Sequence, residues 1–243
     1  IALTYVLSMT WLANRRRALL AALLVALCPL HLVNSHFGTA DVAVISLFYA
    51  TMLAAGHYLR TASYAWFTVM IALCGFTIAV KFFIPLLIAM AALILTERAD
   101  RRWSLCLIAA FVLAGSFSIA SFFNYTPWDF AALMRMILYD NVSIIDGKQP
   151  YENAYLYAWR LVPALGLPVA ALAALALVRF LGNGLAPARH VLERMSFEGV
   201  RGAIRSPGGL LALALVMHGL MIVTAGVSSI RHILIYVPVL CVA

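Results

Sequence analysis

The sequence predicts an all-α integral membrane protein, a polytopic bundle of transmembrane helices. Of its 243 residues, 65% are hydrophobic and 11% are charged, and the mean hydropathy is +1.00. Soluble domains are usually about 45–50% apolar and about 25% charged. The apolar residues form long runs, which are what a bilayer core about 30 Å thick requires of helices. A soluble globular fold is therefore excluded.

Nine apolar runs are the predicted membrane spans, and together they form a single transmembrane domain over 1–243. They cover 1–13, 18–33, 42–59, 63–80, 82–96, 103–123, 158–181, 208–230 and 232–243. The sequence opens and closes inside apolar runs, without an initiator Met or a signal-peptide pattern. We therefore expect the first and last spans to be truncated and the chain to be a fragment that lacks N- and C-terminal parts.

The stretch 63–96 is predicted to be two helices separated by a break. A single helix of that length would be roughly 50 Å long at about 1.5 Å per residue, which is too long for the bilayer. Pro85 removes a helical hydrogen bond and Lys81 favours an interface, so both residues suit a break.

The distribution of basic residues supports that break. With two helices in 63–96, the 17 Lys and Arg residues divide as 12 on one side of the membrane and 5 on the other. With one helix the division is 8 against 8, and Lys81 is left in lipid. The positive-inside rule thus favours two helices and places the Arg-rich loops in the cytoplasm. The expected location is the inner membrane of a prokaryote rather than the endoplasmic reticulum. The twelve residues on the cytoplasmic side are Arg15, Arg16, Arg17, Arg60, Arg98, Arg101, Arg102, Arg179, Arg189, Arg194, Arg201 and Arg205.

The net charge of +8 does not indicate nucleic acid, because the basic residues fall between apolar runs and not along one binding stripe. The predicted partner is the lipid bilayer. The opposite, outer face carries five of the nine acidic residues, namely Asp41, Asp129, Asp140, Asp146 and Glu152. On this face Thr126 to Asp129 resembles a helix start, and Trp128–Tyr139 is predicted to be an amphipathic helix at the membrane surface.

Asp41 is the most informative single residue, because it opens an apolar helix on the outer face. One interpretation is an acid that satisfies free backbone N–H groups at the helix N-terminus. The other is a site carboxylate that holds a metal or orients a hydroxyl. His36, five residues earlier, is either a metal co-ligand or a surface imidazole with no task, and the second is the simpler interpretation.

Lys81 and Arg231 are cations at the outer boundary on different helices. One interpretation is that both extend toward lipid headgroups. The other is a clamp for a phosphate or pyrophosphate, to which the adjacent His232 adds a donor. No nucleophile elbow, phosphate-binding glycine loop or zinc motif accompanies them.

Four segments resemble one family in chain order. The run Ser35–Val42 is similar to the second outer loop of the GT-C superfamily, the lipid-carrier-dependent membrane glycosyltransferases that include protein mannosyltransferases and aminoarabinose transferases. Ala79–Lys81 resembles the family's Thr-Lys segment, and Asn124–Pro127 resembles the start of its amphipathic outer loop. Arg231–Pro238 resembles the start of a helix near its donor site, with His232 where Tyr is commoner.

The resemblance implies transfer of a sugar from a polyprenyl-phosphate donor to an acceptor on the periplasmic or luminal face. Asp41 corresponds to the second-loop acid, which assists metal or acceptor binding, so a divalent metal is an implied cofactor. Lys81 and Arg231, with His232 and His36 as further binding residues, would face the donor phosphate or the acceptor. The family's catalytic acid lies in the first outer loop, which is expected to precede Ile1, so these 243 residues alone are expected to be inactive. The acceptor, whether protein, lipid or glycan, is not specified.

An alternative function is a transporter or flippase for a lipid-linked or anionic substrate, in which the same cations bind phosphate. The sequence has no internal repeat, and its intramembrane charges lie at the boundaries of the spans. Ion-coupled transporters usually carry charges near the membrane midplane, so the pattern favours the transferase. A membrane scaffold without catalytic activity is the third possibility.

Overall fold

A computed structural model describes residues 1–12, 14–36, 40–81, 83–121, 197–224 and 235–238, with isolated positions between 163 and 174. Within these residues every regular element is helical, which confirms the predicted all-α class. The spans expected at 158–181 and 232–243 lie largely outside the described residues. The surface helix expected at Trp128–Tyr139 lies wholly outside them.

The chain divides into two compact units, whose boundary falls inside helix α4 (Ala40–Thr61). Unit 1 contains α1 (Ala2–Leu12), α2 (Arg15–Leu27), α3 (Pro29–His36) and the first turn of α4. Unit 2 contains the rest of α4 together with the helices that follow it up to residue 121, and α12.

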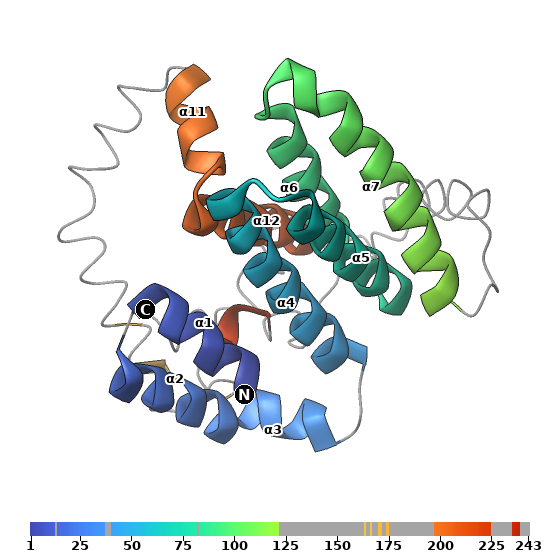
Figure 1. Ribbon diagram of the computed structural model, residues 1–243. Helices are drawn as coiled ribbons and strands as arrows, with labels where there is room; N and C mark the ends of the chain where they lie inside the picture. The colour runs from blue at the N-terminus through green and yellow to red at the C-terminus, as the bar shows by residue number, and fades with distance from the viewer. Residues whose placement is uncertain are drawn as a thin grey trace. The chain divides into compact units, whose positions relative to one another are not determined.

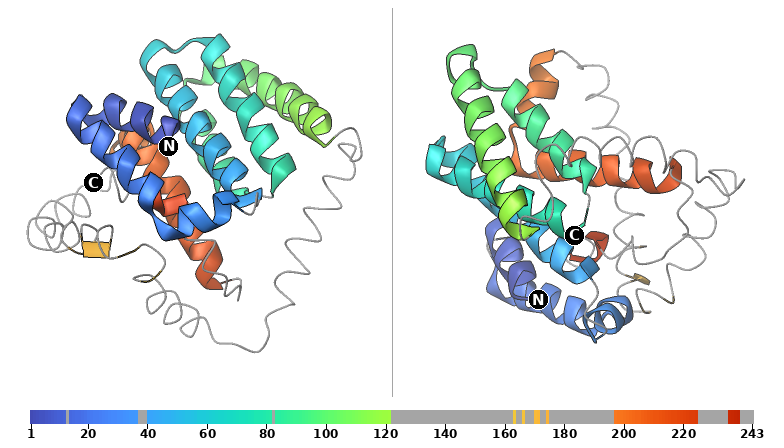
Figure 2. Two further views of the ribbon diagram at one scale, coloured as in Figure 1. Left: turned by 90° about the horizontal axis from the view of Figure 1, so that it is seen from below. Right: turned by 90° about the vertical axis from the view of Figure 1, so that its right-hand side faces the viewer.

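In unit 1, α1 and α2 lie side by side (Figure 2). The side chain of Asn14 caps α2, because its Oδ1 accepts hydrogen bonds from the backbone N–H of Arg16 at 3.0 Å and of Arg17 at 3.1 Å. The run 18–33, expected to be one span, is bent by 61° between α2 and α3. The cause is Pro29, which has no N–H to donate and forces Cys28 into an extended conformation (φ −66°, ψ 120°).

Unit 2 confirms the break at Lys81. Helix α5 (Tyr64–Val80) ends before Lys81, whose backbone is extended at φ −160° and ψ 132°. Helix α6 (Ile84–Leu95) begins just after it, with Pro85 in the first turn, where the missing N–H costs no hydrogen bond.

The helices of unit 2 run in alternating directions. The start of α5 contacts the start of α7 (Ala99–Ala120) through Tyr64 and Arg101, and further along Gly75 of α5 lies against Ser116 of α7. These two helices are therefore parallel and adjacent (Figure 1). Because α5 and α7 start at the same end of the unit, α6, which connects them, must run in the opposite direction.

Ring contacts fix the directions of α4 and α12 (Pro207–Thr224). On α4, Tyr58 packs near Phe67 of α5, with ring centroids 5.2 Å apart, and Phe48 packs near Phe83, 5.3 Å away at the α5–α6 break. On α12, Pro207 approaches Gly56 of α4, and His218 lies 5.0 Å from the ring of Phe83. Thus α4 is antiparallel to α5, and α12 is parallel to α5.

Unit 2 consequently has two opposite ends. We call one the Glu97 end, where the turns at 61–63, 96–98 and 205–206 meet. We call the other the Lys81 end, where α5 gives way to α6 at 81–83. Short helix α11 (Phe197–Ile204), which belongs to unit 1 except for its last residue, precedes the turn at 205–206 in the chain.

By length and composition, two described helices could cross a membrane, α4 and α7, each of 22 residues. The number becomes four if each bent helix pair, α2 with α3 and α11 with α12, is one span. Apolar α5 and α6 are shorter, at 17 and 12 residues. The described residues therefore hold membrane-span candidates, and the total of nine stays a prediction.

Candidate functional site

Asp41 lies in the first turn of α4 and is 8% exposed. A carboxylate in this position is stabilised by the free N–H groups and the positive end of the helix dipole. Burying it at the start of an apolar helix still costs free energy, because a carboxylate loses its hydration there. This placement suits both interpretations of Asp41, the helix N-terminal acid and the site carboxylate.

His36 is the last residue of α3 and is exposed, and residues 37–39, between it and α4, lie outside the described part. Among the described residues no group of three His, Cys, Asp or Glu side chains could hold a metal ion. A catalytic zinc usually takes three protein ligands. His36 and Asp41 alone therefore do not make such a metal centre.

Lys81 follows the last turn of α5, and its backbone N–H donates to the carbonyl of Thr77 at 3.1 Å. Its side chain is partly exposed at the Lys81 end of unit 2. Arg231 and His232 lie outside the described residues, so Lys81 is the one member of the predicted phosphate clamp that the structure places. Asp41 belongs to unit 1 and Lys81 to unit 2.

His218 is a residue that the sequence analysis missed. It is 4% exposed in the interior of α12, and its ring lies 5.0 Å from that of Phe83, two residues beyond Lys81. Ionisable side chains inside apolar helices are rare and often mark functional positions. The available signal was a histidine in the middle of the apolar run 208–230.

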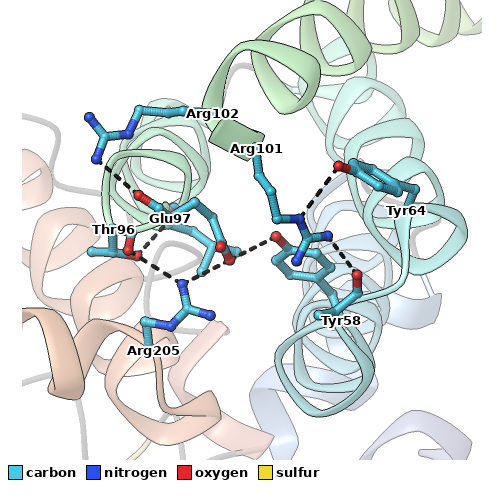
Figure 3. Close-up of polar contacts among 9 residues, drawn as sticks. Tyr58, Tyr64, Thr96, Glu97, Arg101, Arg102 and Arg205 are labelled. Carbon is cyan, nitrogen blue, oxygen red and sulfur yellow. Dashed lines mark hydrogen bonds and ion pairs between the residues drawn. The ribbon is translucent and has the colours of Figure 1, made fainter. Parts of the chain in front are cut away.

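Glu97 was also missed, and it is the centre of the best-defined polar cluster (Figure 3). It follows α6 and its side chain is 3% exposed. Its Oε1 accepts a hydrogen bond from the Tyr58 hydroxyl at 2.8 Å and pairs with Nη1 of Arg205 at 2.8 Å. The same Nη1 donates to the carbonyl of Thr96 at 3.3 Å. Glu97 thus joins α4, the end of α6 and the turn before α12.

Two arginines at the start of α7, Arg101 and Arg102, lie beside this cluster (Figure 3). Arg102 donates through Nη2 to the carbonyl of Glu97 at 2.9 Å. Arg101 donates through Nη2 to the carbonyl of Ala62 at 2.7 Å and through Nε to the hydroxyl of Tyr64 at 3.4 Å. Its guanidinium also lies 4.8 Å from the centre of the Tyr64 ring, a cation–π distance. These bonds hold the α4–α5 and α6–α7 turns together.

The two ends suit different chemistry. A general base must reach the proton that it removes, and Glu97 is buried and already paired with a cation, so its role is structural. The Lys81 end places a partly exposed cation where a helix is interrupted. Such a cation can meet a phosphate group at the membrane boundary.

In the described part of the chain every regular element is helical, and some of these helices are long and apolar enough to cross a membrane. No protein-family model, no curated protein and no solved structure matches the chain.

Proposed function

We propose that this protein is a multi-pass inner-membrane glycosyltransferase of the GT-C type, which moves a sugar from a polyprenyl-phosphate donor to an acceptor on the outer face. The observation that carries the proposal is the separation of charge along unit 2. The Glu97 end holds Arg60, Arg98, Arg101, Arg102 and Arg205, and the opposite end holds Lys81. By the positive-inside rule the Glu97 end faces the cytoplasm and the Lys81 end faces outward.

Lys81 is assigned to the donor phosphate. The polyprenyl tail of the donor stays in the bilayer, so its phosphate lies at the membrane boundary. Lys81 lies at the break between two apolar helices, and this position supports its assignment to that boundary. Its ammonium would stabilise the negative charge that grows on the departing phosphate.

Asp41 is assigned to the acceptor, whose hydroxyl its carboxylate would orient. In the transfer, the acceptor hydroxyl loses its proton and its oxygen bonds to the anomeric carbon of the sugar. The bond from that carbon to the phosphate oxygen breaks, and polyprenyl phosphate leaves with the electron pair. The family resemblance assigns proton removal to an acid of the first outer loop, and no described residue is assigned that role. Because the described residues do not make a metal centre, no step is assigned to a metal.

Substitution of Asp41 tests the proposal in protein expressed from the complete gene. Asp41→Asn should lower sugar transfer from labelled polyprenyl-phosphate donors on the order of a hundredfold, the usual loss when one transition-state contact is removed. Asp100→Asn is a matched control, because Asp100 is an exposed acid in the first turn of α7. Its transfer rate should stay within about twofold, as for a surface site without a role. Full activity in Asp41→Asn would refute the role of Asp41.

One observation favours the alternative, a transporter or flippase. His218 is buried within an apolar helix, the placement that is common for ionisable residues in transport proteins. Sealed vesicles containing the protein separate the two functions. Movement of a labelled lipid-linked substrate without formation of a new glycosidic product would support the transporter, and product formation would support the transferase.

A further inference from the structure

The Glu97 end carries more positive than negative charge. Its described residues include five arginines and two acids, Glu97 and Asp100, which leaves a formal surplus of three positive charges. The carboxylate of Glu97 is already paired with Arg205 at 2.8 Å. The surplus therefore belongs to the other arginines, which are Arg60, Arg98, Arg101 and Arg102.

Three of these arginines are held by neutral groups. Arg101 donates to the carbonyl of Ala62 and Arg102 to that of Glu97, while Arg60 donates through Nε to the carbonyl of Gly56 at 3.2 Å. A backbone carbonyl fixes the direction of a guanidinium without cancelling its charge. We call Arg60, Arg101 and Arg102 the arginine platform. The backbone carbonyls hold the guanidinium groups of the platform in place, and an anion can still neutralise their positive charge.

Aromatic side chains indicate the depth of this platform in the membrane. Tyr64 and Trp66 at the start of α5 and Trp103 at the start of α7 are all exposed, and Tyr64 lies beneath the guanidinium of Arg101. Trp66 is further supported by His57, which stacks on it at 4.4 Å. Exposed Trp and Tyr at the ends of apolar helices lie at the level of lipid headgroups. These exposed rings therefore support a position of the platform near the lipid phosphates.

We propose that the arginine platform is a binding site for anionic lipid headgroups in the leaflet at the Glu97 end. Each guanidinium offers paired N–H donors that match the oxygens of a phosphodiester. An anionic lipid such as phosphatidylglycerol would supply the charge that the platform lacks, whereas a zwitterionic headgroup brings its own cation. The site rests only on the chain lying in a membrane and does not depend on sugar transfer.

The proposed site is tested by measuring the protein's preference for anionic over zwitterionic lipid. The complete protein is reconstituted with spin-labelled phosphatidylglycerol or phosphatidylcholine, and the immobilised fraction of each lipid is compared. The wild type should hold phosphatidylglycerol more strongly, on the order of fivefold per engaged arginine at low salt. Arg101→Gln with Arg102→Gln should lose most of that preference, and the corresponding Lys variants should keep part of it.

Two further variants keep the test decisive. Arg201→Gln is the control. Arg201 is paired with the carboxylate of Glu198 at 3.7 Å, so its substitution should leave the lipid preference unchanged. Arg101→Gln alone spares the bond from Arg102 to Glu97 and should lower the preference partly, with the thermal unfolding midpoint confirming the fold. A folded double variant with full preference would overturn the site. Equal displacement of both lipids by inorganic phosphate would also overturn it, in favour of a soluble anion site.

Discussion

At the Glu97 end of unit 2, three turns of the chain are tied together by a buried carboxylate, a tyrosine hydroxyl and arginines on backbone carbonyls. At the Lys81 end, the ring of Phe83 packs against those of Phe48 and His218 at a helix break that contains Lys81. The first arrangement is suited to holding helices in place, and the second places a partly exposed cation at a helix break. The comparison separates the residues that stabilise the bundle from the lysine that we propose as a contact to the donor phosphate.

The largest expected effect on stability is that of Glu97→Ala. It leaves Arg205 without its carboxylate and the Tyr58 hydroxyl without its acceptor in a buried place, so the free energy of unfolding should fall by about 3 kcal/mol. Denaturant unfolding in mixed micelles measures the loss.

The matched control for Glu97→Ala is Glu198→Ala. Glu198 also pairs with an arginine, but its side chain is 77% exposed and the ion pair is 3.7 Å long. Its removal should cost less than about 0.5 kcal/mol. Equal losses in the two variants would show that the Glu97 end is not the stabilising one.

A smaller effect is expected from Gly75→Ala, which tests the packing of α5 toward the Lys81 end. An added Cβ would collide with Oγ of Ser116 and lie 3.0 Å from the carbonyl of Leu113. Small residues allow such close approach of membrane helices. Overpacking should lower the free energy of unfolding by about 2 kcal/mol.

Gly115→Ala provides the comparison for Gly75→Ala, because nothing lies within 4 Å of the added Cβ there. It should be neutral or slightly stabilising, since Ala is the better helix former. Adding Ser116→Gly to Gly75→Ala should restore part of the lost stability. A Gly75→Ala variant as stable as Gly115→Ala would mean that the two helices are not closely packed.

A smaller effect than that of Gly75→Ala is expected from Tyr58→Phe. The change removes one hydrogen bond to Glu97 but keeps the ring against Phe67, so the cost should be about 1.5 kcal/mol, at the low end for a bond to a charged group. Tyr64→Phe, whose hydroxyl accepts a long 3.4 Å bond at an exposed position, should change stability less. The reverse order in thermal unfolding would contradict the central place of Glu97.

Local features of this fold were predictable from sequence, and distant pairings were not. The break before Pro85 was expected because proline and a charged residue act on their own segment. The bend at Pro29 arises from the same local effect, and the bent helix pair could still be one span. The pairing of Glu97 with Arg205 depends on tertiary packing across more than a hundred residues, and no local pattern indicates it. Composition predicted helices that could span a membrane, but it did not distinguish the paired Glu97 or the buried His218 from other residues.

The position of Arg205 in the chain also determines when, during synthesis, the Glu97 end can be completed. Thr96 and Arg205, which are bonded in the finished structure, are 109 positions apart in the chain. At about 5–20 residues per second, the ribosome needs roughly 5–20 s to reach Arg205 after it has made Thr96. During that interval the neighbouring carboxylate of Glu97 lacks its arginine, and α4 to α7 have not yet been joined by α12. Helix α12, which is made after α4 to α7, therefore closes the Glu97 end, and an arrest of synthesis after α7 would leave a bundle with an uncompensated acid.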